Sequence, residues 1–143
     1  MRLDASLLLA VLVACDGPSP SDPPTNDVST TTLEVVQGWP VLPDDVELGR
    51  VLAVAVHPDG RVFVAHAAGY ESPNEERIPT SPILVFDPDT GELLDAFGED
   101  LFLYPHGLSF DTRGRLWVTD SDGGVAVRLD AEGRVELTIG EAP

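Results

Sequence analysis

The residues of this chain best suited to binding a metal ion are its three histidines, His57, His66 and His106. His106 lies in the stretch LYPHGLSFD (103–111), where a loop passes into an apolar, strand-like run. Neutral imidazole suits zinc, but a catalytic zinc site needs three protein ligands and one open position. His106 is therefore either one ligand of a larger set or only a polar residue at the mouth of a hairpin.

The other two histidines are weaker candidates. His57 lies in His-Pro-Asp-Gly, a turn sequence, and we expect it to be exposed. His66 ends a strand-like run at the place where Asp120 ends a later one, which favours a structural role. The phenols of Tyr70 and Tyr104 are available, and we expect Tyr104 to pack beside Pro105.

The elements that must position these residues form an internal repeat. VAVHPDGRVFVAH (54–66) matches LSFDTRGRLWVTD (108–120), and each is followed by a second hairpin, 83–97 or 125–139. Val, Ile, Leu and Phe runs favour strands, and Asp-Pro-Asp-Thr-Gly and Asp-Ala-Glu-Gly favour tight turns. A repeated four-stranded unit predicts an all-β fold, a β-propeller, with about two antiparallel blades here of an expected six.

The predicted organisation has four parts. Residues 1–14 form a lipoprotein signal peptide, and residues 15–37 form a lipid-anchored Pro/Ser/Asp-rich linker with a possible first strand within 28–36. Residues 38–100 form blade 1 with an inserted loop at 67–81. Residues 101–143 form blade 2, and the chain ends before a third blade. The inserted loop has no strand pattern and is either functional or a tolerated surface loop.

Cys15, the only cysteine, ends the apolar run SLLLAVLVAC, and a polar linker follows at once. This pattern resembles a bacterial lipoprotein signal, with lipid placed on Cys15; the alternative is an ordinary signal peptide with an incidental cysteine. The prediction places the protein in the bacterial cell envelope, extracytoplasmic and held on the membrane by its lipid anchor.

Charge excludes one class of partner. The chain carries 25 acidic and 8 basic residues, for a formal charge of -17. A field of that sign repels phosphate backbones, so we expect no nucleic acid partner. Open blade faces would expose apolar surface, which the missing blades or self-association could cover.

Four stretches together resemble the peptidyl-α-hydroxyglycine α-amidating lyase (peptidylamidoglycolate lyase) family, which has a six-bladed propeller of the NHL-repeat kind. The resemblance covers roughly residues 38–140, and PHGLSFD followed by WVTD is its sharpest part. It implies zinc and calcium in a central channel and cleavage of peptidyl-α-hydroxyglycine to a peptide amide and glyoxylate. The stretches are GWP (38–40), ELGRVLAVAVHPDGRVFVAH (47–66), ILVFDPDTGELL (83–94) and DLFLYPHGLSFDTRGRLWVTD (100–120).

Carried over residue by residue, the resemblance makes His106 a zinc ligand and the carbonyls of Val54 and Leu108 calcium ligands. Ala67 stands where the family has its catalytic arginine, and Arg77 in the inserted loop is a candidate replacement. The other two zinc histidines and the catalytic tyrosine belong to later blades, so no catalytic residue is assigned here.

We therefore expect a truncated or degenerate lyase-like propeller with an incomplete site, inactive as this chain alone, whose substrate would be a peptide or other small molecule. The alternative is a non-catalytic propeller binding module displayed on a membrane surface. Ala67 favours the alternative, whereas the PHGL motif and the paired calcium positions favour the lyase.

Overall fold

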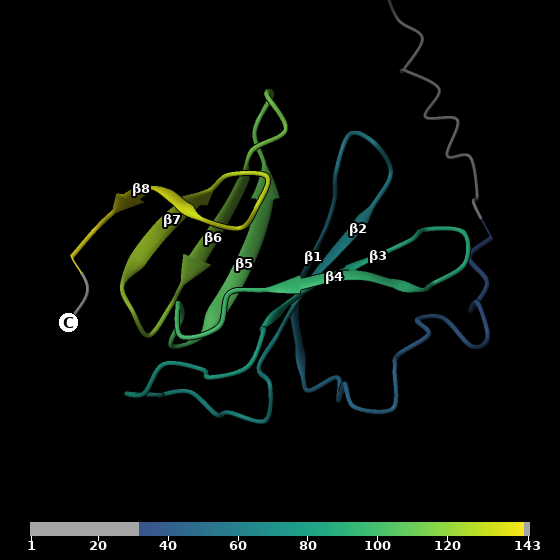
Figure 1. Ribbon diagram of the computed structural model, residues 1–143, viewed down its shortest axis with the longest axis horizontal. Helices are drawn as coiled ribbons and strands as arrows, with labels where there is room; N and C mark the ends of the chain where they lie inside the picture. The colour runs from purple at the N-terminus through teal and green to yellow at the C-terminus, as the bar shows by residue number, and fades with distance from the viewer. Residues whose placement is uncertain (1–31, 142–143) are drawn as a thin grey trace, which may run out of the picture. The chain divides into compact units, whose positions relative to one another are not determined.

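The computed structural model describes residues 32–141 and contains two four-stranded antiparallel sheets (Figure 1). Both sheets lie in the compact unit that begins at Val35. The first sheet, blade 1, contains β1 (Val51–Val56), β2 (Val62–His66), β3 (Ile83–Phe86) and β4 (Leu93–Phe97). The second, blade 2, contains β5 (Pro105–Phe110), β6 (Leu116–Asp120), β7 (Val125–Leu129) and β8 (Val135–Ile139).

Each sheet is a simple meander in chain order, so the predicted all-β fold with two four-stranded antiparallel blades is confirmed. The predicted signal peptide, Cys15 and the linker lie outside the described residues. Of the possible strand 28–36, the described residues 32–36 form no strand. No helix in the described part of the chain is long and apolar enough to cross a membrane.

The two blades repeat the same register at a spacing of 54 residues. Val54 pairs with Val64 in blade 1, and Leu108 pairs with Val118 in blade 2. The spacing recurs between Arg50 and Tyr104, which precede β1 and β5. A residue in one blade therefore has a structural equivalent in the other, and the two can be compared directly.

Aspartates close the turns, as the sequence predicts. The Asp111 carboxylate accepts the backbone N–H groups of Arg113 and Arg115, and Asp130 does the same for Glu132 and Arg134. Such bonds satisfy turn backbone that the strand ladders leave unpaired. A side-chain hydrogen bond from Arg115 holds the pKa of Asp111 well below its usual range, so this carboxylate remains an acceptor at acidic pH.

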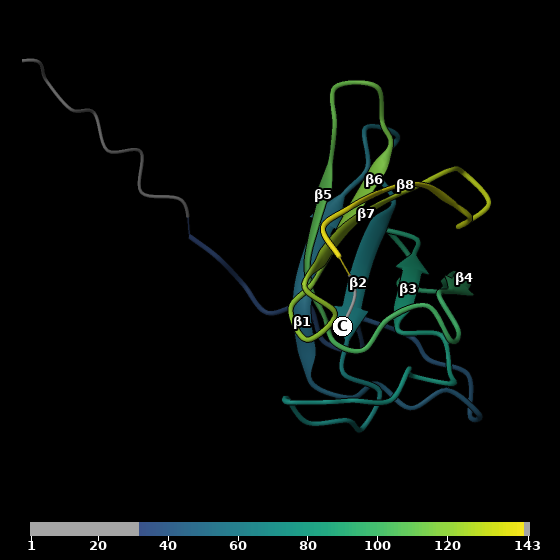
Figure 2. The same ribbon diagram turned by 90° about the vertical axis from the view of Figure 1, so that its left-hand side faces the viewer.

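The main core lies between the blades. Phe63, Ala65, Ile83 and Val85 of blade 1 pack with residues of β6 and β7, with Leu108 and Phe110 at the margin. The rings of Phe63 and Phe110 meet edge to face, with centroids 4.9 Å apart. Figure 2 shows β5 running beside β1, so the first strands of the two blades adjoin.

The opposite face of blade 1 is covered in part by its own N-terminal segment. Trp39, Leu42, Val46 and Leu48 pack on Val64, Leu84 and Phe86 in a second cluster. By the 54-residue spacing, Leu48 is the equivalent of Phe102, which is fully buried in the main core. The segment leading into each first strand thus places one apolar residue against its own blade.

Apolar residues remain exposed on the outer face of each blade. Val54 and Val56 are 57% and 62% exposed on blade 1, and Leu137 and Ile139 are 39% and 56% exposed on blade 2. Trp117 is half-buried on this outer side of blade 2, where its cross-strand partner is Arg128, whose guanidinium lies 5.7 Å from the indole.

We predict that Phe102→Ala will lower the free energy of unfolding by about 3–5 kcal/mol, because it removes a fully buried ring between the blades. Leu94→Ala, at a site 49% exposed, should cost less than about 0.5 kcal/mol. Chemical denaturation of both variants measures the two losses. Equal losses would show that the blades do not depend on this contact.

Candidate functional site at the start of the first strands

His106 is exposed at a β-bulge near the start of β5. Pro105 pairs with Asp120 and Gly107 pairs with Thr119, so His106 has no partner on β6. Its ring centroid lies 6.3 Å from that of the buried Tyr104, at an interplanar angle of 31°. A bulge bends a strand and redirects a side chain, which here leaves the imidazole free of hydrogen-bonding neighbours among the described residues.

Gly107 is required beside this histidine. A Cβ at position 107 would lie 2.5 Å from the Thr119 hydroxyl, which is too close for any side chain. The cross-strand approach that leaves His106 unpaired therefore depends on glycine at the next position. Within the Pro-His-Gly-Leu sequence, Gly107 thus has a structural role that is separate from any chemical role of His106.

Val54 and Leu108 occupy the same place in the two first strands. Each lies two residues after a bulge, at Leu52 and His106 respectively, and each pairs with the middle of the second strand. Because β1 and β5 adjoin, the two backbone segments lie on neighbouring strands (Figure 2). The structure therefore brings the Val54 and Leu108 backbones and His106 onto one pair of strands.

Asp120 fastens the segment that leads into β5. Its buried carboxylate accepts the backbone N–H groups of Leu103 at 2.7 Å, Tyr104 at 2.9 Å and Gly123 at 2.9 Å. A Cβ at position 123 would lie 2.7 Å from the carboxylate, so glycine is needed for this approach. The buried charge is therefore fully hydrogen-bonded, as a buried carboxylate must be.

His66 is the equivalent of Asp120 in blade 1 and holds the segment that leads into β1. Its Nδ1 accepts the N–H groups of Gly49 at 3.1 Å and Ala68 at 3.3 Å, and its Nε2 donates to the Ser81 carbonyl at 3.2 Å. Gly49 is the blade 1 equivalent of Leu103. Burial lowers the pKa of His66, opposed by the hydrogen bond to Ser81. Both ring nitrogens are occupied, so His66 is a structural residue and is not available to a metal.

His57 differs from its expected place. It lies in the predicted turn, but its side chain is only 20% exposed and its ring meets Phe110 edge to face at 4.9 Å. Its Nδ1 lies 2.7 Å from a carboxylate oxygen of Asp59, which needs a proton on Nδ1, so the 3.3 Å approach of the Asp59 N–H to that atom is not a hydrogen bond. This contact lowers the pKa of Asp59 to about 2. The turn sequence gave no sign that the second blade would cover this histidine.

A cation contacts Tyr104, the aromatic neighbour of His106. Arg50 immediately precedes β1, and its guanidinium lies 3.4 Å from the Tyr104 hydroxyl and 2.8 and 2.9 Å from the two carboxylate oxygens of Glu71. The hydrogen bond to Glu71 raises the pKa of Arg50. Tyr104 thus contacts the guanidinium of Arg50 through its hydroxyl, while its ring centroid lies 6.3 Å from that of His106.

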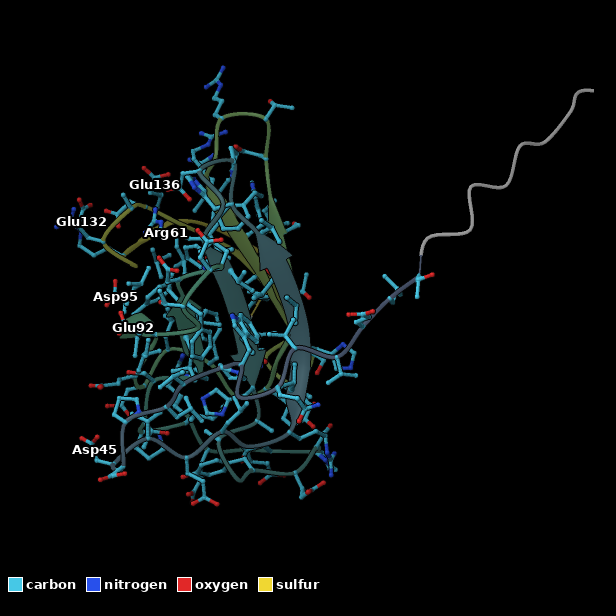
Figure 3. All side chains as sticks on the ribbon, turned by 90° about the vertical axis from the view of Figure 1, so that its right-hand side faces the viewer. Asp45, Arg61, Glu92, Asp95, Glu132 and Glu136 are labelled. Carbon is cyan, nitrogen blue, oxygen red and sulfur yellow. The ribbon has the colours of Figure 1, made fainter. Side chains whose placement is uncertain are left out.

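Elsewhere, acidic groups outnumber cations. Figure 3 shows acidic side chains along the outer side of the described chain, away from β1, with Arg61 among them. The labelled acidic residues are Asp45, Glu92, Asp95, Glu132 and Glu136. Arg61 is itself paired with Asp59 at 2.9 Å, so this side presents a negative field.

The NHL repeat family matches residues 102–124, which include β5, its bulge and β6. Peptidyl-α-hydroxyglycine α-amidating lyase 2 of Drosophila melanogaster is 33% identical over 110 residues, covering 68% of this chain and 27% of that protein. The rat peptidylglycine α-amidating monooxygenase is 54% identical over 43 residues, covering 30% of this chain and 4% of that protein.

This chain is a relative of the peptidyl-α-hydroxyglycine α-amidating lyases. It spans about a quarter, or less, of the length of these curated relatives. A virginiamycin B lyase from Staphylococcus aureus, solved as the selenomethionine protein, has a TM-score of 0.43 and 14% identity, covering 61% of this chain and 26% of that one. The sequence relatives, together with the NHL match on the second blade, therefore carry the assignment.

The described residues of this chain do not form a complete metal site by themselves. No group of three or more His, Cys, Asp or Glu side chains is placed to hold a metal ion within residues 32–141. Zinc needs three protein ligands, and calcium needs six to eight oxygens. His106 and the two carbonyl positions thus fit parts of such sites, and no catalytic step is assigned to a metal here.

Ala67, where the resemblance places an arginine, is buried, and its N–H donates to the Arg50 carbonyl at 2.8 Å. Arg77 donates instead to the Leu101 carbonyl. Arg50 is therefore the backbone neighbour of position 67 and brings a guanidinium to the same end of β1. Sequence reasoning missed Arg50, because its contact with Tyr104 joins the two blades and is not written in either one.

Because burial depresses the pKa of His66, the unfolded state binds more protons as the pH falls below the ordinary histidine pKa of about 6.5. Protonation of His66 should therefore leave the free energy of unfolding unchanged above about pH 6.5. Below that pH, the free energy of unfolding should decrease as the pH falls. We predict that His66→Asn, whose amide oxygen can accept the Gly49 and Ala68 N–H groups, will reduce this slope. Denaturation curves between about pH 5 and 7.5 measure it.

His66→Ala is the matched variant for the structural role. It removes the acceptor and leaves two partly buried N–H groups unpaired, so it should be less stable than His66→Asn at pH 7.5. An unchanged pH slope in His66→Asn, or equal stability of the two variants, would contradict this account.

Proposed function

We propose that this chain belongs to a peptidylamidoglycolate lyase-type propeller, in which it supplies one part of the active centre. The observation that carries the proposal is His106, exposed at a bulge on the first strand of a blade, with Gly107 required beside it. Leu108 and Val54 lie at equivalent positions on adjoining strands. The reaction would cleave peptidyl-α-hydroxyglycine to a peptide amide and glyoxylate, as the names of its relatives suggest.

In this proposal His106 would hold a zinc ion and the carbonyls of Val54 and Leu108 would contribute to a calcium site. The remaining ligands would come from residues other than those described. Zinc, when bound, would polarise the hydroxyl oxygen of the substrate. The described residues would then supply only part of the site.

We propose Arg50, in place of Arg77, as the cation that would meet the substrate carboxylate. Guanidinium offers a planar fork that matches a carboxylate with two hydrogen bonds. Arg50 supports this role because its guanidinium already holds a carboxylate, that of Glu71, beside Tyr104 and His106. Tyr104 would position Arg50 through its hydroxyl, at 3.4 Å.

A second candidate function is a non-catalytic propeller module that binds a peptide or protein. The burial of an uncharged alanine at position 67 favours it, since no group there can meet a charged substrate directly. The two functions differ in what His106 does. In a lyase the imidazole takes part in turnover, whereas in a binding module it is one surface residue among others.

The outer blade faces need partners in either case. We propose that a further blade of the same kind, or self-association, covers the apolar rows that include Val54, Val56, Leu137 and Ile139. The contact between the two described blades supports this. In that contact, the face of blade 2 with Leu108 and Phe110 packs on the face of blade 1 with Phe63 and Val85. With a charge of -17, we propose no role in nucleic acid binding.

The test of function is glyoxylate release from a peptide ending in α-hydroxyglycine, with zinc and calcium added to the full chain. We predict that any release will be lost in His106→Ala and kept in His57→Ala, because of the three histidines only His106 is exposed on the first strand of a blade. Zinc should likewise shift the imidazole resonances of His106 and leave those of His66 unmoved. Peptide binding without release, unchanged in His106→Ala, would favour the binding module.

We propose that the protein is anchored by lipid on Cys15 in the bacterial cell envelope, facing away from the cytoplasm. The support is sequence alone: an apolar run that ends at the single cysteine and is followed by a polar linker. We predict that the chain expressed in bacteria will incorporate labelled fatty acid and that Cys15→Ser will abolish the label. Labelling that survives in Cys15→Ser would refute the anchor.

A further inference from the structure

The inserted loop at 67–81 contacts both blades. Its Glu71 reaches Arg50 at the start of β1, and its Asn74 side chain donates to the Leu103 carbonyl next to β5 at 2.8 Å. The Asp122 carboxylate accepts the Ser72 hydroxyl at 2.9 Å and the Asn74 N–H at 2.7 Å. The loop is thus held on blade 2 by bonds that do not involve Glu71.

The loop therefore fixes where Glu71 lies, independently of its ion pair. Glu71 presents both carboxylate oxygens to one guanidinium nitrogen of Arg50, at 2.8 and 2.9 Å. A carboxylate held there occupies N–H donors of the guanidinium that an incoming carboxylate would use. The neighbouring Tyr104 hydroxyl and the exposed His106 ring mark this as the same end of the first strands as the candidate site.

The ion pair is easily exchanged. The side chains of Arg50 and Glu71 are 59% and 72% exposed, so water screens their attraction and the pair contributes little to stability. A ligand carboxylate can replace Glu71 without unfolding the loop, because the bonds of Ser72 and Asn74 to blade 2 remain. The loop then keeps Glu71 close by as a competitor.

We propose that Glu71 is a built-in competitor for the anionic group of a ligand at Arg50, so that the inserted loop sets how tightly carboxylates bind there. The ligand class is a small carboxylate or a peptide with a free C-terminal carboxylate. The proposal rests on the proposed function only for the identity of that ligand. It concerns binding and needs no turnover.

The experiment measures binding of N-acetylglycine to the isotope-labelled full chain by the amide resonances of Tyr104 and Glu71, with neutral N-acetylglycinamide as the probe lacking the carboxylate. We expect Glu71→Gln to tighten N-acetylglycine binding about two- to fivefold, the range an exposed ion pair allows. Arg50→Gln should abolish the carboxylate-dependent shift. Arg50→Lys, which keeps the charge and loses the fork, should fall between the two.

Glu75→Gln is the matched control, because it removes the same charge from the same exposed loop at a residue with no ion pair among those described. It should leave the affinity unchanged. Equal tightening in Glu75→Gln would assign the effect to general charge and overturn the proposal, as would wild-type binding in Arg50→Gln. Tightening confined to Glu71→Gln would support the competitor even if no glyoxylate were ever released, so the two proposals can fail separately.

Discussion

The packing of one blade face on the next is the constraint on which the rest of the described structure depends. A four-stranded sheet of this size has two faces and cannot bury both by itself. In this chain the face with Phe63 and Val85 is covered by the face with Leu116 and Leu129, and Phe102 fills the space between them. Once the blades pack in this way, β1 and β5 must adjoin, and whatever lies at the starts of those strands is brought together.

In each blade, one buried side chain fixes the start of the first strand by accepting backbone N–H groups. The two blades use different side chains for this role. Asp120 uses an anionic carboxylate and His66 uses a neutral imidazole to accept backbone N–H groups of the incoming segment. Either works because the requirement is a buried acceptor at one position. The choice has consequences elsewhere, since burial lowers the pKa of His66 and protonation at falling pH would weaken this contact in blade 1.

Much of the fold could be predicted from the sequence because its causes are local. Alternating apolar runs and Asp-Gly turns define each hairpin, and the spacing of 54 residues reveals the repeat before any contact is known. The partial burial of the His57 side chain could not be predicted, because its ring is covered by Phe110 from the other blade. More generally, which face of a strand is covered depends on the neighbouring sheet, which the strand's own pattern does not specify.

The candidate site was half predictable for the same physical reason. His106 and the carbonyl positions of Val54 and Leu108 were assigned from the resemblance to the lyase family, and the structure places them on adjoining first strands. Arg50 could not be found that way, because its place beside Tyr104 arises only when blade 1 packs on blade 2 and the inserted loop crosses between them.

The bulges at Leu52 and His106 show how such a site is distributed over the fold. Both residues lack a cross-strand partner at the same point of the first strand, yet one is a leucine and the other a histidine. The bulge is therefore a feature of the blade fold. The sequence of each blade determines whether the residue at the bulge has a side chain that could bind a metal. The zinc and calcium sites proposed here would therefore be shared among blades, with an imidazole from His106 of blade 2 and only backbone from blade 1.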